Sequence, residues 1–244
     1  VICVPTTLSG GEFNALSGAT DEATQHKQGY EHRDMAPVMV VLDPRITVHT
    51  PEWLWLSTGV RSVDHAVETL SSDKSNDFAN GLAESALGLL VEGLPRVKAD
   101  PADMEGRLKC QIGAWQSMIS IIGGVPMGAS HAIGHILGGT CDVPHGYCSC
   151  VMSPYVQQWN AEHDDSRQAR TLAVLGHTHD TAAEALDAFI RGFRRQGGHW
   201  DGEPQHRVGN QWRTYGLQHR GFRQGRHCRQ CCRRRDSSPS KWNP

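Results

Sequence analysis

The chain has 244 residues, of which 38% are hydrophobic and 20% are charged, and its formal net charge is −2. These values are typical of a water-soluble globular protein with one large or two modest domains. They exclude a membrane-spanning helix, because no apolar run reaches about eighteen residues, and the first residues lack the basic and apolar regions of a signal peptide.

Charge and cysteine content vary along the chain. Residues 196–244 contain ten Lys and Arg against three Asp and Glu, whereas the rest contains 14 against 23, which indicates two regions of different character. The eight cysteines are irregularly spaced and do not form a disulfide framework. We therefore expect a reducing compartment, the cytoplasm.

Two strands are predicted near the start. The first covers residues 2–5 and leads into a Gly, Ser and Thr loop at residues 6–12. The second, at residues 38–42, is a continuous apolar run, which is expected of a strand covered on both faces. Residues 1–48 are thus predicted to be the C-terminal part of an α/β domain. Because the first residue is Val1 rather than Met, we expect the chain to begin inside a longer protein.

Helical patterns follow from residue 50 onward. Thr50 is predicted to cap the first helix and Pro51 to occupy its first position. Apolar residues then repeat with helical spacing, which predicts an all-α domain over residues 49–195. The expected helices cover residues 51–58, 60–70, 77–97, 103–122, 131–137, 167–176 and 180–193.

The basic tail, residues 196–244, contains little Ile, Leu or Val, so we expect it to be disordered. A frame change or a wrong splice junction in the gene would produce such a stretch. Its cysteines at 228, 231 and 232 lack a second Cys/His pair at zinc-site spacing. Its arginine run is interpreted as a solvated charge run, and we expect no nucleic-acid partner.

Histidines carry the strongest chemical signal. His131 and His135 are four residues apart, so on a helix they share one face, and His145 follows a Gly-rich turn. Three converging imidazoles would suit Zn²⁺ or Fe²⁺, but one or two of them as core or surface residues is an equally open interpretation. His65 lies on an apolar helix, where a single histidine is usually a core residue; beside the other three it is a candidate fourth site residue.

Three segments resemble the iron-containing alcohol dehydrogenase family. Residues 5–12 are similar to its Pro-Thr-Thr nucleotide-contact loop, residues 59–68 to its first metal-ligand helix, and residues 128–146 to its histidine block. Their order and separations also agree, and the resemblance extends over roughly residues 1–193. It implies the dehydroquinate synthase-like fold, here as an α/β remnant of a nucleotide-binding domain followed by an all-α helical domain.

The resemblance also implies roles for individual residues. Thr6 and Thr7 match cofactor contacts of the family, and His135 matches a histidine beside the nicotinamide and substrate. The histidines that match metal ligands are His65, His131 and His145.

The sequence departs from the family at Arg61, which stands where the fourth metal ligand is an aspartate. A cation there opposes a divalent metal, and Asp64 points in a different direction on the helix. The loop at residues 5–12 is also one residue shorter, as in the maleylacetate reductase branch, whose members resemble this chain in lacking the aspartate. In that setting Arg61 and the histidines would bind a dicarboxylate. The family's Gly-rich pyrophosphate loop would lie upstream of Val1.

The resulting hypothesis is an NAD(P)-dependent oxidoreductase most like maleylacetate reductase, with His135 and Arg61 as catalytic residues. Two alternatives stay open: a metal-dependent alcohol dehydrogenase that uses Fe²⁺ or Zn²⁺, and an inactive fragment without the phosphate-binding loop. The expected partner is a small molecule, namely an alcohol, an aldehyde or a maleylacetate-like dicarboxylate. We expect a homodimer and no membrane partner.

Overall fold

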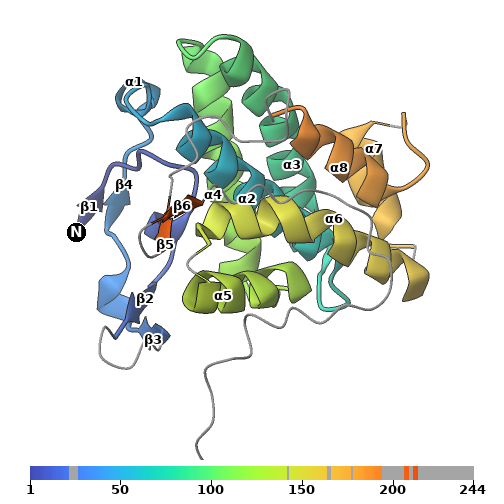
Figure 1. Cartoon of the computed structure of the whole chain (residues 1–244), viewed down its shortest axis with the longest axis horizontal. Helices are drawn as coiled ribbons and strands as arrows, with labels where there is room; N and C mark the ends of the chain where they lie inside the picture. The colour runs from blue at the N-terminus through green and yellow to red at the C-terminus, as the bar shows by residue number, and fades with distance from the viewer. Residues whose placement is uncertain are drawn as a thin grey trace, which may run out of the picture.

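The computed structural model describes residues 1–21, 27–141, 143–163, 166–176, 178–193, 206–208 and 211–213. Over the first 193 residues of the chain, strands come first and long helices follow, in the order that the sequence predicts. Helices α3, α4, α6 and α7 pack against α2, α5 and α8 pack against α6, and strands β1 to β4 lie at one edge of this bundle (Figure 1).

The helices are α1 (Pro44–Thr47), α2 (Glu52–Ser71), α3 (Asp77–Ala99), α4 (Met104–Ile122), α5 (Ala129–Cys141), α6 (His145–His163), α7 (Gln168–Leu175) and α8 (Ala182–Arg191). The strands are β1 (Ile2–Cys3), β2 (Leu16–Thr20), β3 (Lys27–Glu31), β4 (Met39–Val40), β5 (His206–Val208) and β6 (Gln211–Arg213). Two 3₁₀ turns, η1 (Gly11–Phe13) and η2 (Arg33–Met35), interrupt the first part. In the described residues no helix combines the length and apolar character needed to cross a bilayer.

Helix α2 is the centre of the bundle. Every residue from 55 to 70 is buried except Arg61, and a helix buried on all sides belongs in a core. The sequence predicted two helices here, but Gly59 does not break α2. A Cβ at Gly59 would lie 2.4 Å from Cδ2 of Leu94, so the glycine allows α2 and α3 to pack closely. The core includes Leu56, Val60, Val63 and Val67 of α2 and, from α3, Leu87, Leu90 and Leu94.

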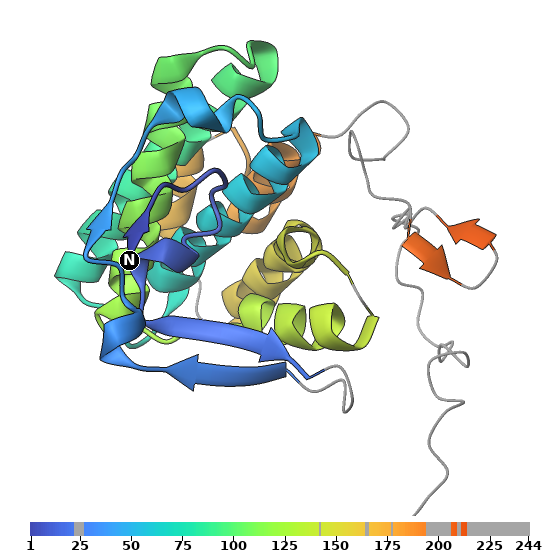
Figure 2. The ribbon, with the colours of Figure 1, turned by 90° about the vertical axis from the view of Figure 1, so that its left-hand side faces the viewer.

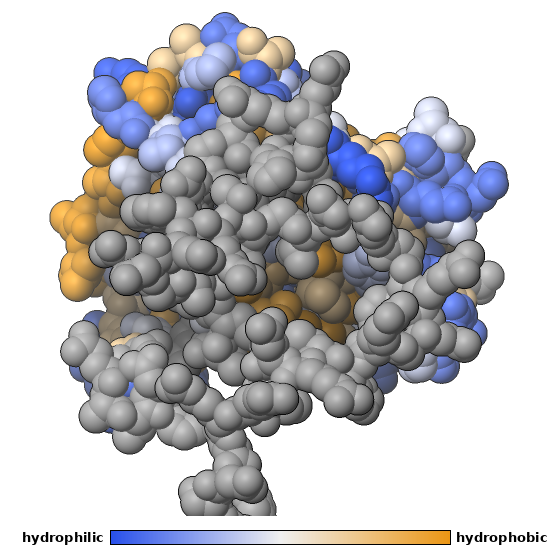
Figure 3. Space-filling view, viewed as in Figure 1, coloured by the Kyte–Doolittle hydropathy of each residue, from blue (hydrophilic) through white to orange (hydrophobic). Residues whose placement is uncertain are grey.

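The strands form small separate sheets. β1 pairs with β4 in parallel, and β2 pairs with β3 as an antiparallel hairpin that lies beside the α5 end of the bundle (Figure 2). The expectation that residues 38–42 form a strand covered on both faces was wrong, because Val38 is 83% exposed and Met39 is 55% exposed. Among the described strands β4 pairs only with β1, so apolar side chains collect along this edge (Figure 3).

Helix α6 was missed by the sequence analysis. It contains Pro154, and its apolar residues have almost no helical periodicity, so local sequence gives little signal. Packing against α2, α5 and α8 stabilises it, with Tyr147, Cys148 and Cys150 buried. In the basic tail the structure describes only β5 and β6, six residues that pair with each other. The rest of the tail, and with it the predicted disorder, lies outside the described residues.

Candidate active site

The loop at residues 5–12 is held against α2 by hydrogen bonds. The backbone N–H of Leu8 donates to Oγ1 of Thr58 at 3.1 Å, and Oγ of Ser62 donates to the Leu8 carbonyl at 2.5 Å. Leu8 itself is fully buried. Thr50, predicted to cap α2, instead donates to the Thr6 carbonyl at 2.6 Å, because its side chain points toward this loop. The loop therefore has a fixed position beside the helix that carries Arg61 and His65.

Three helices bring the four candidate histidines together. His65 comes from α2, His131 and His135 come from α5, and His145 begins α6. Nε2 of His65 lies 3.1 Å from Nε2 of His131. The ring of His145 has its centroid 5.9 Å from that of His131 and 4.9 Å from that of His135. Residues separated by as many as 80 positions in the sequence thus share one site, whose chemical roles remain predictions.

His65 is the most enclosed member of this cluster. Its side chain is buried, and Nδ1 lies 3.5 Å from Oγ of Ser117 on α4. Burial, and then the positive charges of His131 and Arg61, hold the pKa of His65 well below its usual range. His65 is therefore a neutral imidazole at neutral pH.

His131 has the opposite electrostatic setting. Its Nδ1 lies 3.3 Å from Oε2 of Glu68 and 3.6 Å from Oδ2 of Asp64, although neither contact has hydrogen-bond angles. Burial lowers the pKa of His131, but the two carboxylates outweigh burial and the pKa is raised overall. Of the two histidines, His131 is therefore the one that carries a proton more readily.

A cavity of about 600 Å³ opens beside these residues. Arg61, His65, His131 and His135 line one side of it, and the β2–β3 hairpin lines another. Burial lowers the pKa of Arg61 to about 10, against the attraction of Asp64, so the guanidinium remains charged at neutral pH. The cavity thus combines one fixed cation with several imidazoles.

Thr6 and Thr7, the predicted cofactor contacts, are not among the residues that line this cavity; Ser9 and Gly11 of the same loop are. Thr7 Oγ1 lies 3.1 Å from Ser9 Oγ. No sequence signal pointed to the hairpin as a wall, because its alternation of polar and apolar residues is weak.

The residues fit a metal ion only in part. An Nε2 to Nε2 distance of 3.1 Å is compatible with two imidazoles on one ion. However, the position of the family's aspartate is occupied by the partly buried Arg61 cation, and Asp64 lies on the Nδ1 side of His131, away from His65. The charge therefore opposes a divalent ion beside His65 and His131, and we derive no chemistry from one.

Sequence reasoning missed Asp64 and Glu68 as site residues. They are four apart, so they share a face of α2, and together with His131 they place three possible ligand atoms within 4.8 Å of one another. The available signal was a pair of carboxylates among Val, Ala and Leu in the second half of this helix, which is unusual unless the charges have partners.

Comparison with known proteins gives consistent matches. The model of the Fe-containing alcohol dehydrogenase family, C-terminal, matches residues 55–195. Dehydrogenase ALT3 from Alternaria alternata is 38% identical over 205 residues, which are 77% of this chain and 53% of that protein. Maleylacetate reductase from Pseudomonas sp. (strain P51) is 31% identical over 160 residues, 66% of this chain and 45% of that one.

Solved structures agree with the sequence matches. The crystal structure of maleylacetate reductase from Rhizobium sp. strain MTP-10005 superposes with a TM-score of 0.71 at 28% identity, covering 78% of this chain and 53% of that one. The chain thus spans about half the length of the relatives it matches.

Proposed function

The chain belongs to the Fe-containing alcohol dehydrogenase family, and on that premise we propose that it forms the substrate-binding part of an NAD(P)-dependent oxidoreductase most like maleylacetate reductase. The observation that carries the proposal is Arg61, a partly buried cation that lines the 600 Å³ cavity together with His65, His131 and His135. A positive charge at this position suits an anionic substrate better than a metal ion.

Arg61 is proposed to bind a carboxylate of the substrate. A guanidinium presents several N–H donors in a plane that matches a carboxylate, and partial removal from water strengthens this pairing. Because Arg61 extends from the middle of the buried helix α2, its position varies little. A bound dicarboxylate would then have one end fixed beside the imidazoles.

His135 is proposed to deliver the proton. It lines the cavity and is exposed to solvent, unlike His65 and His131, which are buried. Imidazole exchanges protons near neutral pH, so an exposed histidine can be reloaded from water after each turnover. NAD(P)H would supply the hydride to one carbon of the substrate double bond, and His135 would supply the proton to the other.

The contact of the cofactor with Thr6 and Thr7 is also part of this proposal. The loop that contains them is fixed against α2 by Leu8, which supports a constant geometry for a nucleotide bound along it. A metal-dependent alcohol dehydrogenase is the second candidate, supported by the 3.1 Å separation of the His65 and His131 Nε2 atoms.

The test is NAD(P)H oxidation with maleylacetate and, separately, NAD(P)⁺ reduction with simple alcohols. Both are measured on the 244-residue chain and on any longer product of the same gene. We expect activity with the dicarboxylate. Arg61→Met should lower kcat/KM by about 10- to 100-fold, the effect of losing a charged hydrogen bond of about 1.5–3 kcal/mol. Arg61→Lys, which keeps the charge, should lose less. Activity with alcohols alone, or equal kinetics for the two variants, would contradict the proposal.

A further inference from the structure

The N-terminus of α5 is capped by a residue from another helix. The N–H groups at the start of a helix have no partner within the helix, and they favour a negative charge. Here Glu68 of α2 accepts hydrogen bonds from the backbone N–H groups of Gly128 at 3.0 Å, Ser130 at 2.8 Å and His131 at 3.4 Å. One carboxylate thus joins α2 to the beginning of the helix that carries His131 and His135.

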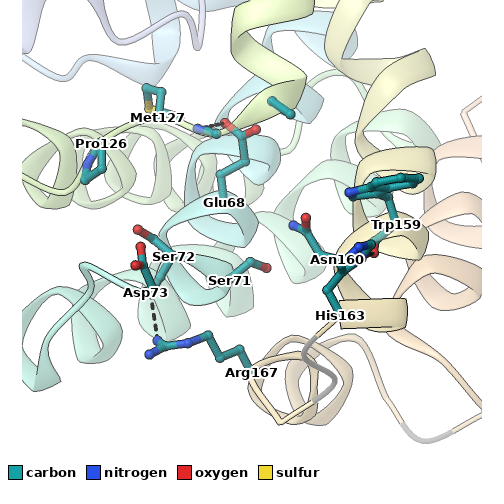
Figure 4. A pocket seen from close by; sticks show the side chains of 12 residues that line it. Glu68, Ser71, Ser72, Asp73, Pro126, Met127, Trp159, Asn160, His163 and Arg167 are labelled. Atoms are coloured by element: carbon teal, nitrogen blue, oxygen red, sulfur yellow. Dashed lines mark hydrogen bonds between the residues drawn. The ribbon is translucent and has the colours of Figure 1, made fainter.

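Close contact at this point depends on Gly128. A Cβ at that position would lie 2.7 Å from Oε1 of Glu68 and 3.0 Å from its carboxyl carbon. Any larger residue would push the carboxylate away from α5. Figure 4 shows Glu68 reaching from α2 toward Met127 at the top of a second pocket, of about 390 Å³, and Met127 lines the active-site cavity as well.

The same carboxylate also faces the ring of His131. Oε2 of Glu68 lies 3.3 Å from Nδ1 of His131, and Oδ2 of Asp64, which accepts a hydrogen bond from Ser130 Oγ at 2.8 Å, lies 3.6 Å from that nitrogen. All three side chains are at most 5% exposed. Two oxygens that face Nδ1 favour a proton on that nitrogen, which directs Nε2 toward His65 and the cavity.

We propose that Glu68 is a positioning residue for the active site. It sets the distance between α2 and α5, and it holds the His131 ring in the form that carries a proton on Nδ1. Asp64 assists through Ser130 and through its own approach to the ring. This inference rests on the proposed function, because it explains how the imidazoles beside the substrate are kept in register with Arg61.

The experiment compares Glu68→Gln with Glu184→Gln in the whole chain. Glu184 is a matched control, because it also caps a helix: its carboxylate accepts the N–H of Thr181 at 3.3 Å in the capping box of α8, far along the chain from the histidines. Imidazole nitrogen and proton resonances are recorded on ¹⁵N-histidine-labelled protein without substrate or cofactor, and the signals of His131 are assigned with His131→Gln.

In the unaltered chain and in Glu184→Gln, we expect one His131 form with a protected Nδ1–H signal. In Glu68→Gln that signal should be lost and replaced by the averaged signals of an imidazole that exchanges between tautomers. Glu68→Asp keeps the charge and should restore the Nδ1–H signal in part. An unchanged His131 ring in Glu68→Gln, with shifts only in the backbone N–H groups of α5, would reduce Glu68 to a helix cap and overturn the proposal.

If Glu68→Gln does not fold, the same spectra are recorded on Asp64→Asn and Glu68→Asp. Unchanged His131 ring signals in both variants would overturn the proposal. Where hydride transfer is measurable, Glu68→Gln should lower kcat about 10- to 100-fold, as typical for residues that orient a site histidine, with little change in KM. Because the spectra need no substrate, failure of the proposed function appears as absent turnover with an intact Nδ1–H signal. Failure of the positioning role appears as an unchanged ring in the variants.

Discussion

Replacing Gly146 with alanine tests whether the contact between α6 and α2 sets the position of His145. Gly146 is buried and follows His145 at the beginning of α6. A Cβ at this position would lie 2.8 Å from the carbonyl oxygen of Ser57, 2.9 Å from its carbonyl carbon and 3.0 Å from its Oγ. Two of these atoms belong to the backbone of the buried helix α2, so α6 would have to move away.

The magnitude follows from two opposing effects. Overpacking of a well-packed core costs about 1–3 kcal/mol, and a clash with backbone belongs near the upper end of that range. Alanine regains at most about 1 kcal/mol over glycine within a helix. The net loss of folding free energy is therefore about 2 kcal/mol.

Gly81→Ala in α3 is the matched control. It is the same substitution in a helix, but Gly81 is exposed and no atom lies within 4 Å of the position that its Cβ would occupy. Only the conformational effect remains, so this variant should be stabilised by about 0.5–1 kcal/mol. The two variants should thus differ by about 3 kcal/mol.

Urea unfolding of the whole chain, followed by far-ultraviolet circular dichroism, measures this difference from the transition midpoints. Gly146→Ala should unfold at lower urea than the unaltered chain, and Gly81→Ala at slightly higher urea. Equal midpoints for the two variants would refute the reasoning, because they would mean that α6 can shift from α2 at no cost.

Three further predictions concern the site and the core. Arg61→Asp removes the opposing cation and places a carboxylate beside His65, so calorimetric titration should detect Zn²⁺ binding at least 10-fold tighter than in Arg61→Ala. Equal Zn²⁺ affinities in the two variants would contradict the charge argument. Thr58→Val removes the acceptor for the Leu8 N–H and should lower the free energy of unfolding, measured by urea titration, by about 1–3 kcal/mol. The control is Thr181→Val, which removes an exposed capping hydrogen bond and should lower the free energy of unfolding by less. Burial raises the pKa of Cys110 to about 12, so the folded chain keeps a thiol proton that the unfolded chain loses above about pH 9. The contribution of Cys110 to the free energy of unfolding is therefore complete below pH 9 and falls as the pH rises toward 12, and Cys110→Ala should flatten this part of the profile of stability against pH.

Local sequence was sufficient for most helices of the bundle. Asn76 and Asp103 accept backbone N–H bonds at the beginnings of α3 and α4, and helical spacing of Leu87, Leu90 and Leu94 marks the buried face of α3. These are interactions within one or two helical turns, so the pattern of residues records them directly. The motifs also predicted the family and its fold class correctly, as the family match and the solved relatives confirm.

The tertiary structure decided what local patterns do not encode. α6 has almost no helical periodicity of its own and forms where Gly146 fits against Ser57. The apolar run at Val38 was read as a buried strand, yet burial depends on which elements cover a strand, not on its own residues. The bond between His65 and His131 joins residues 66 positions apart, and that of Glu68 with Ser130 joins residues 62 apart.

The spacing of His131 and His135 on one helical face was therefore fixed by the chain itself, since a helix sets the relation between positions four apart. Their approach to His65, Glu68 and Arg61 was set by the packing of α5 on α6 and of α6 on α2, together with the side-chain contacts that link α5 to α2. Packing depends on the fit of whole surfaces, and no short stretch of sequence contains both sides of that fit.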